Sequence, residues 1–496
     1  MIGSQSRSTP AWVQDAIFYQ IFPDRFAKSE RLTKPANLQA WDDPPTQQGY
    51  HGGDLLGIVE KLDYLEELGV NALYLNPIFR SASNHRYHTH DYYQVDPLLG
   101  GNAALAELVE ALHQRGMRLV LDGVFNHASR GFFQFNDILE NGPHSAWLDW
   151  FVIQDWPLSP YDGDRPANYI SWWGNRALPK FNTDNEQVRE FIYDVATYWL
   201  REYDIDGWRL DVPAEIDTPG FWETFRQHVK EAKADAYLVG EIWNQAPDWL
   251  SGARFDGLMN YPFAAAVTAF VAGDRVSPTL VKGRSYDPYP PADAEAFAQR
   301  IDELLEGYAW PVTLSQLNLL DSHDTPRLLS LARGDAAGLS LATLLQMTFP
   351  GAPCIYYGDE IALRGTTAYD EPHDDADARW PFPWHERSRW NEELLKDVRQ
   401  LVAMRHQEPV LRSGAFSPLR AKDHCYAFAR HESNTALITI VNAGEEAHSD
   451  TLSLPEDLPP VDQFRVVFGR ADLKVEESRS LTYAVAARSG TIVSIR

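Results

Sequence analysis

Short apolar runs alternate with segments of helical apolar spacing along most of the chain from residue 16 onward. The run AIFYQIF (16–22) is typical of a buried strand, and LLGIVEKLDYLEELG (55–69) has the spacing of a helix that ends at Gly69. Strands are then expected at 71–78, 117–126, 206–212, 236–243, 255–261, 314–324 and 352–360, and helices at 103–116, 188–203, 219–233 and 393–407. This alternation predicts a parallel sheet with crossover helices.

Eight strands of this kind predict an α/β fold, a TIM (β/α)8 barrel, built from residues 1–127 and 186–410 (domain A). The rhythm breaks at 128–185, where Gly, Pro, Asn and aromatic residues show little periodicity, so we expect an irregular subdomain (domain B) inserted after the third strand. From 411 to 496 the pattern changes to short alternating strands. That texture predicts a C-terminal antiparallel β-sandwich (domain C).

The segment DGWRLDVPAEI (206–216) carries charges where a buried strand is expected. Trp208, Leu210 and Val212 alternate along one face, which leaves Arg209 and Asp211 together on the other. Taking charges out of water costs several kcal/mol per ion before pairing recovers part of it. A charged pair in this position therefore indicates a reason other than folding.

Charged and polar residues end several of the expected strands, and a barrel brings the carboxyl ends of its strands to one rim. They are Asp122, Asn126, His127, Arg209, Asp211, Glu241, His323 and Asp324. Any one of them alone could be structural, but several carboxylates around one pocket suit glycoside hydrolysis. One carboxylate attacks, an acid protonates the leaving oxygen, and negative charge stabilises a cationic transition state. An arginine beside the attacking group is expected to lower its pKa.

Seven segments in order resemble the α-amylase family of retaining glycosidases (glycoside hydrolase family 13) over nearly the whole chain. They are FYQIFPDRF (18–26), GGDLLGI (52–58), DGVFNH (122–127), GWRLDV (207–212), GEIW (240–243), SHDTPR (322–327) and GAPCIYYGDE (351–360). LPKFN (178–182) and the stretch 240–263 are similar to the group of neopullulanases, cyclomaltodextrinases, maltogenic amylases and maltodextrin glucosidases. That group usually carries an N-terminal β-domain that builds dimers, whereas this chain starts almost directly at its first strand.

The resemblance implies a role for each matching residue. Asp211 would be the nucleophile, Glu241 the general acid/base and Asp324 the stabiliser of the transition state. Trp243 would line the acceptor side, and Asp122 would be a structural partner near Arg209, with Asn126 also structural. His88 replaces an Asp common in the group, which bears on donor-side specificity. The residues expected to contact sugar are Tyr87, His88, His127, Arg209, Trp243, His323, Asp377 and Arg379.

Metal ions and cofactors are not expected to be required. Many relatives bind calcium in an Asp/Asn-rich loop after the first strand, but here that loop is AKSERLTK (27–34), with Glu30 as its single acid. Gly52 and Asp54 add too little for an ion that takes six to eight oxygen ligands. The acidic loop 369–380 could hold a metal, but its Asp-x-Asp-x-Arg pattern resembles a sugar-contacting loop of the family.

Charge and composition limit the classes of molecule that we expect this protein to bind. The formal net charge of −26 disfavours nucleic acid and anionic membranes as partners and suits a neutral ligand. Two cysteines, no apolar leader and no run of about 18 apolar residues predict a cytoplasmic protein without a membrane span. A monomer or a weak homo-oligomer is expected.

The sequence thus predicts a retaining α-glucan hydrolase that acts on maltodextrins, cyclodextrins or pullulan, with some transglycosylation. Two alternatives stay open: an exo-acting α-glucosidase or a family member that acts on sucrose or trehalose, and a non-catalytic carbohydrate-binding or transporter-accessory protein. Linkage preference, endo or exo action, the transfer-to-hydrolysis ratio and oligomeric state are not set by the sequence.

Overall fold

The computed structural model describes residues 9–282, 289–365, 375–461 and 463–495. Its centre is a parallel sheet of eight strands in the order β8-β7-β6-β5-β2-β1-β10-β9. A parallel bridge between Met259 and Leu317 joins the two edge strands, so the sheet closes into a barrel and the fold prediction is confirmed. The barrel strands are β1 (Phe18–Ile21), β2 (Ala72–Leu75), β5 (Arg118–Gly123), β6 (Gly207–Leu210), β7 (Tyr237–Gly240), β8 (Gly257–Leu258), β9 (Leu317–Leu319) and β10 (Ala352–Tyr356).

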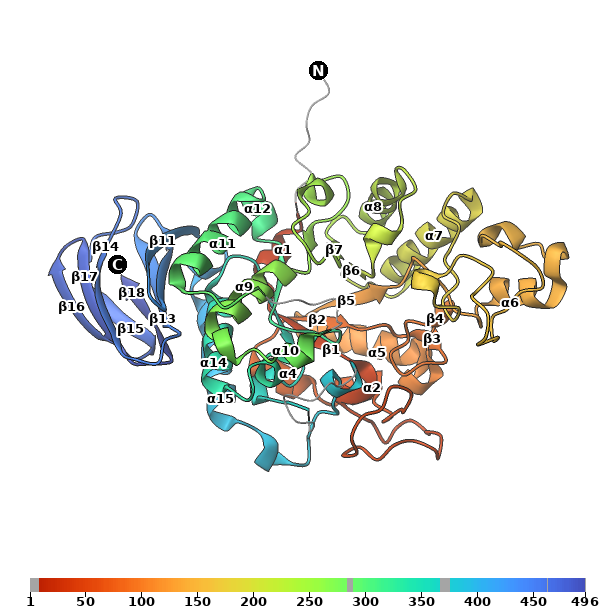
Figure 1. Ribbon diagram of the computed structural model, residues 1–496, viewed down its shortest axis with the longest axis horizontal. Helices are drawn as coiled ribbons and strands as arrows, with labels where there is room; N and C mark the ends of the chain where they lie inside the picture. Colours follow the sequence, from red (N-terminus) through yellow and green to blue (C-terminus); the bar gives the residue numbers. More distant parts are fainter. Residues whose placement is uncertain (1–8, 283–288, 366–374, 462, 496) are drawn as a thin grey trace, which may run out of the picture.

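Helices surround the barrel (Figure 1). The longer ones are α5 (Gly101–Gln114), α7 (Glu186–Glu202), α8 (Phe221–Ala232), α9 (Tyr261–Val271), α11 (Ala294–Glu306), α14 (Ala336–Thr348) and α15 (Glu392–Gln407). The single helix expected at 55–69 is two helices, α3 (Leu55–Val59) and α4 (Leu62–Leu68), because Lys61 between them leaves the helical conformation. No helix of the described ranges is long and apolar enough to cross a membrane.

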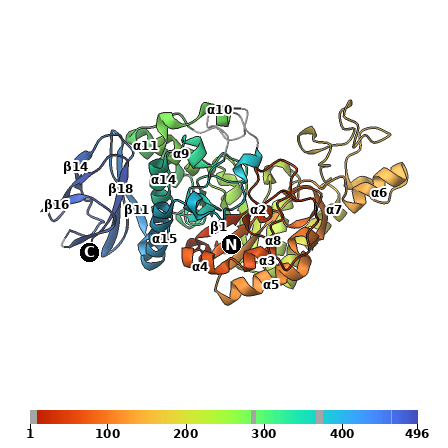
Figure 2. The same cartoon turned by 90° about the horizontal axis from the view of Figure 1, so that it is seen from below.

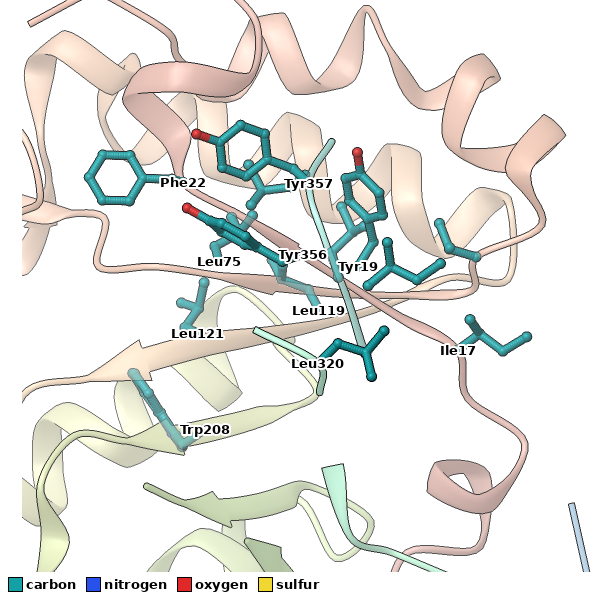
Figure 3. Close-up of a cluster of buried hydrophobic side chains, with 14 of the residues drawn as sticks. Ile17, Tyr19, Phe22, Leu75, Leu119, Leu121, Trp208, Leu320, Tyr356 and Tyr357 are labelled. Carbon is teal, nitrogen blue, oxygen red and sulfur yellow. The ribbon is translucent and has the colours of Figure 1, made fainter. Parts of the chain in front are cut away.

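Alternate residues of the barrel strands face two separate cores. Figure 3 shows one of them, which packs against the helices and includes Tyr19, Leu75, Leu119, Trp208 and Tyr357. The other fills the barrel interior and includes Phe18, Tyr74, Val120, Tyr237 and Cys354. Because side chains two residues apart share a face, Asp122 follows Val120 into the interior, and its neighbour across the sheet is Arg209. The polar residues are therefore the last interior layer at the carboxyl end of the strands.

The inserted segment between β5 and α7 is mostly irregular. It contains α6 (Phe133–Asn141) and isolated bridges. The bridge from His127 to Lys180 joins its two ends, and the bridge from Phe151 to Phe181 joins its middle to its second end. Figures 1 and 2 place α6 and the C-terminal strands at opposite ends of the molecule. The insert thus extends from the rim of the barrel where the polar strand ends lie.

The C-terminal part is an antiparallel β-sandwich, as predicted. One sheet has the order β11-β12-β13-β18-β15 and the other β14-β17-β16, with a buried core between them. The strands are β11 (Ala415–Lys422), β12 (Cys425–Glu432), β13 (Thr435–Asn442), β14 (His448–Ser453), β15 (Phe464–Gly469), β16 (Asp472–Glu477), β17 (Ser480–Val485) and β18 (Ser489–Ile495). Tyr426, Phe428 and Leu437 on the other face of the larger sheet join the core of the barrel helices. The domain boundaries given above remain predictions.

Candidate active site

One buried arginine organises the carboxylates at the barrel rim. Nη1 of Arg209 lies 2.8 Å from Oδ1 of Asp122 and 2.9 Å from Oδ1 of Asp211. Nη2 of the same guanidinium lies 2.8 Å from Oε2 of Glu241. All four side chains are at most 9 % exposed, so one positive charge faces three carboxyl groups away from water.

The backbone after β6 places Asp211 and Glu241 side by side. Val212 does not continue the strand alternation expected from the sequence, because its φ of 36° lies in the left-handed region. This conformation is unfavourable for a β-branched residue, and strain of this kind concentrates at functional sites. It directs the Val212 N–H to Oε2 of Glu241 at 3.0 Å. The turn therefore links the end of β6 to the carboxylate that follows β7.

Asp324 has its own set of partners on the same rim. Oδ2 of Asp324 lies 2.9 Å from Nε2 of His323, and Oδ1 accepts a hydrogen bond from Arg379 at 3.2 Å. The amides of Gln20 and Asn76 donate to Nδ1 of His323 at 3.0 and 3.1 Å. Two donors at Nδ1 leave the ring proton on Nε2, where it faces Asp324. Gln20 and Asn76 were not predicted, although both stand at strand ends.

Their surroundings shift the pKa of Asp211 and Glu241 upward and the pKa of Asp324 downward. Burial raises the pKa of Asp211 well above its usual range, and neighbouring Glu241 adds to the rise, although Arg209 opposes it. Burial likewise raises the pKa of Glu241. Burial also raises the pKa of Asp324, but His323, Arg379 and Arg209 lower that pKa by more, so the net direction is downward. Arg209 lowers the pKa of Asp211, as expected, but burial outweighs this contribution, so the net direction is upward and not the low pKa expected from the sequence.

Asp122 connects the arginine to two tyrosines. Its Oδ2 accepts hydrogen bonds from Tyr74 at 2.9 Å and from Tyr87 at 2.8 Å. The Tyr87 hydroxyl also lies 2.6 Å from Nε2 of His323. Tyr87 thus bridges the Asp122 and Asp324 sides of the rim.

His127 and Asn126 stand together after β5. Nδ2 of Asn126 lies 3.2 Å from Nδ1 of His127, whose ring stacks on Trp172 of the insert with centroids 5.5 Å apart. Burial lowers the pKa of His127 to about 3, so this imidazole is neutral near pH 7. Neither residue contacts the three carboxyl groups around Arg209 through a hydrogen bond found among the described residues.

A cavity of about 380 Å³ is lined in part by Arg379, the partner of Asp324. Arg379 lines it together with His85 and His88, whose rings meet edge to face at 4.9 Å. Of the acidic loop, residues 369–374 lie outside the described residues, and Asp375 lines the cavity. The predicted Asp377 instead accepts a hydrogen bond from the Trp380 indole at 3.0 Å.

Trp243 lies against the carboxylate that follows β7. Its indole N–H donates to Oε1 of Glu241 at 3.2 Å, and its ring stacks on Tyr261 with centroids 3.8 Å apart. The indole is therefore held flat beside the carboxyl group.

The loop after β1 does not fit a calcium ion. Asp54 caps α3, accepting from the Gly57 N–H at 2.7 Å, and its other oxygen lies 2.9 Å from the ammonium of Lys34. Lys34 also donates to the carbonyl of Leu98 at 2.6 Å. Glu30 is exposed. A lysine ammonium thus occupies the position where the oxygens of Asp54 and Leu98 converge, and no group of three or more acidic, His or Cys side chains suited to a metal occurs among the described residues.

Comparison with known proteins gives one consistent family. Residues 20–400 match the family described as alpha amylase, catalytic domain. The cyclomaltodextrinase of Geobacillus thermopakistaniensis (strain MAS1) is 42 % identical over 441 residues, 88 % of this chain and 70 % of that protein. Neopullulanase 2 of Thermoactinomyces vulgaris is 39 % identical over 458 residues, 91 % of this chain and 73 % of that one.

A solved structure covers almost the same length. The acarbose-soaked debranching enzyme of Nostoc punctiforme is 50 % identical, has a TM-score of 0.87, and is matched over 98 % of this chain and 99 % of that one. The strand-end carboxylates, the closed barrel and the match over 20–400 lead to one conclusion. This chain belongs to the α-amylase family of glycoside hydrolases.

Proposed function

We propose that this protein is a retaining α-glucan hydrolase. The observation that supports it most is the sharing of one guanidinium by Asp211 and Glu241, with Asp324 on the same rim. Retaining enzymes need a nucleophile and an acid/base close together, with carboxyl groups about 5–5.5 Å apart. Two of the family's carboxyl groups held on adjacent nitrogens suit that spacing.

In the first step, Asp211 attacks the anomeric carbon and Glu241 protonates the leaving oxygen. Arg209 binds Oδ1 of Asp211, so we assign the attack to Oδ2. The C1–O bond to the leaving sugar breaks as the ester bond to Asp211 forms. Oε2 of Glu241 accepts a hydrogen bond from the Val212 N–H and lies 2.8 Å from Nη2 of Arg209, so we assign the acid proton to Oε1. Burial raises the pKa of Glu241, which suits an acid, but it also raises the pKa of Asp211, so the assignment of the two roles rests on the family match and not on these pKa directions.

In the second step, Glu241 takes a proton from water, the water oxygen attacks C1, and the ester bond to Asp211 breaks. Two displacements at one carbon retain the anomeric configuration. Asp324, whose pKa is lowered, stays ionised and stabilises positive charge on the sugar. Tyr87, His127, His323 and Arg379 would contact that sugar, and Arg379 with His88 would shape the donor-side cavity.

The substrate range follows from the relatives. Names such as cyclomaltodextrinase and neopullulanase favour maltodextrins, cyclodextrins and pullulan over sucrose or trehalose. The retained carboxyl groups favour an enzyme over a binding-only protein. A second candidate, cleavage of α-1,6 branch points, is favoured by the 50 % identity to a debranching enzyme. A required cofactor, an oligomer and a nucleic-acid partner are not part of the proposal, and the cytoplasmic location stays a prediction.

Product analysis tests the proposal. The protein would be incubated separately with β-cyclodextrin, pullulan, maltotetraose and a branched dextrin, and the products separated by chromatography. Ring opening, with maltose or panose as products, would support the main function. Release of linear chains from the branched dextrin alone would support the second candidate. No product from any substrate would overturn both.

A further inference from the structure

An exposed tryptophan stands in the insert. Trp173 is 72 % exposed, more than any other large hydrophobic side chain in the described part of the chain. Its φ of 49° and ψ of 32° lie in the left-handed region, which bulky residues rarely adopt. Because the indole is exposed, burial of the side chain does not offset the backbone strain. The strained backbone, more than the exposure alone, points to a role other than packing.

A column of rings connects Trp173 to the barrel rim. Trp173 stacks on Trp172 with centroids 4.9 Å apart and planes 16° apart, and Trp172 stacks on His127 at 5.5 Å and 24°. His127 follows the end of β5. One face of Trp173 is thus covered by Trp172, and its exposure leaves the opposite side open to solvent. A flat ring with one open face is the geometry on which a pyranose stacks its C–H face.

Hydrogen bonds fix Trp173 relative to the loop of Asp211. The indole N–H donates to Oε1 of Glu215 at 3.1 Å. Glu215 ends the short 3-10 helix Pro213–Glu215, which begins two residues after Asp211. The ammonium of Lys180, from the other arm of the insert, donates to the Glu215 carbonyl at 2.5 Å. The platform is therefore built into the insert and the loop after β6 together.

Trp173 and the cavity lie over different strands. The cavity is lined by loops that follow β1, β2 and β10, which are neighbours in the barrel. The rings of His127 and Trp173 and the side chain of Glu215 belong to loops that follow β5 and β6, beside the strand β7 that carries Glu241. A glucan with one end in the cavity would pass the carboxyl groups before reaching Trp173.

We propose that Trp173 is a stacking platform for a glucosyl unit on the leaving-group side of the cleaved bond, and this inference rests on the proposed function. The platform holds the departing part of a long substrate. After the first step it holds a sugar acceptor, whose hydroxyl replaces water and turns hydrolysis into transglycosylation. An uncharged aromatic surface suits this neutral ligand.

Two substrates distinguish sugar binding at Trp173 from the catalytic step itself. α-Maltosyl fluoride has a sugar only on the donor side, whereas maltoheptaose also extends over the leaving-group side. For Trp173→Ala we expect kcat/KM for maltoheptaose to fall about fivefold, the size of one lost stacking contact. Transfer to added maltose should fall as well, while α-maltosyl fluoride is hydrolysed at the wild-type rate. Trp173→Tyr should recover most of the loss.

Phe133→Ala is the matched control, because Phe133 is 66 % exposed in the same insert but belongs to α6. It should behave as wild type. Equal kcat/KM of Trp173→Ala and wild type on maltoheptaose would overturn the platform alone. A parallel loss on both substrates would also overturn it, since Trp173 would then act through Glu215 on Asp211. A fall in molecular mass, measured by sedimentation, without a change in chain-length preference would assign Trp173 to an interface between copies instead. Wild-type inactivity on both substrates would overturn the proposed function itself.

Discussion

Two regions of this molecule bury arginine in opposite ways. At the barrel rim, Arg209 is enclosed by three carboxyl groups. Burial lowers the pKa of Arg209, but the charges of Asp122 and Glu241 raise it, and the net direction is upward. Where the barrel meets the sandwich, Arg430 donates to the carbonyls of Thr348, Leu411 and Gly414 at 2.8–3.1 Å, and Arg405 donates to those of Met347, Phe349 and Gly351. Burial lowers the pKa of both of these arginines.

The contrast shows two uses of a buried arginine: Arg209 belongs to a site for chemistry, whereas Arg405 and Arg430 hold structural elements together. Carbonyls at the end of α14 are partly negative and cannot change protonation state, so Arg405 and Arg430 join elements permanently. Carboxyl groups around Arg209 can gain or lose protons, and their number exceeds what one arginine can neutralise. We therefore expect substitutions at the rim to change rates, and substitutions at the junction to change stability.

The largest effect is expected for Asp211→Asn. Loss of a nucleophile that acts with a partner residue typically lowers kcat by a factor of about 10⁴ or more. The variant should adopt the same fold as the wild type, which circular dichroism would check. Substantial residual hydrolysis of maltoheptaose would exclude Asp211 as the nucleophile.

Arg430→Met should have the largest effect on stability. Methionine fills the space but leaves three buried carbonyls without a donor, so we expect unfolding to become easier by about 3 kcal/mol. Urea denaturation measures this change. Arg420→Met is the control, because the Arg420–Asp450 pair is at the surface and should contribute under about 1 kcal/mol. A large loss of kcat in correctly folded Arg430→Met would contradict the division between the two regions.

A smaller effect concerns pH. A carboxyl whose pKa is raised on folding favours the folded state at low pH, and this contribution is lost as the pH rises through the raised pKa. Ionised Asp211 should therefore oppose folding at neutral and alkaline pH. The Asp211→Asn variant should exceed the wild type in stability by about 1 kcal/mol there, and the gap should close toward pH 4. An Asp211→Asn variant that is less stable than the wild type at neutral pH, with a deficit that shrinks on acidification, would show that the ion pair with Arg209 outweighs burial.

The smallest effect is expected from removing metal ions. Lys34 supplies a cation to Asp54, although burial lowers the pKa of its ammonium. Dialysis against a chelator should leave the melting temperature unchanged. Lys34→Met should destabilise the fold by about 1 kcal/mol, because Asp54 loses its partner. A fall in melting temperature after chelation would reveal a metal site and contradict the role given to Lys34.

The sequence predicted the rim well because polar residues directly follow regular strands. Asp211 and Glu241 come directly after β6 and β7, as their apolar runs indicated. Periodicity failed where the backbone leaves the strand, as at Val212. It also gave no sign of α9, whose residues Tyr261–Val271 are all buried and therefore show no polar face.

Contacts between distant segments were beyond the sequence pattern. Trp173 stands in a stretch without periodicity, and only the hairpin geometry brings it to Glu215. Asp375 and Asp377 are equivalent in an acidic loop until the short helix Asp375–Ala378 forms. One carboxylate then lines the cavity and the other binds Trp380.

The bridge between Met259 and Leu317, which closes the barrel, is where we expect the sheet to open locally. β8 spans two residues, and Gly257 is required there because a Cβ would lie 2.1 Å from the carbonyl oxygen of Ser315. Local opening begins where the fewest hydrogen bonds hold a structure, so deuterium uptake should reach the amides of Met259 and Asn260 before those of the central strands. Sδ of Met259 also accepts a hydrogen bond from Nε of Arg209 at 3.4 Å. Each opening between β8 and β9 would therefore disturb Arg209, which holds Asp211 and Glu241. On heating, catalytic activity should fall at a lower temperature than that at which the protein unfolds.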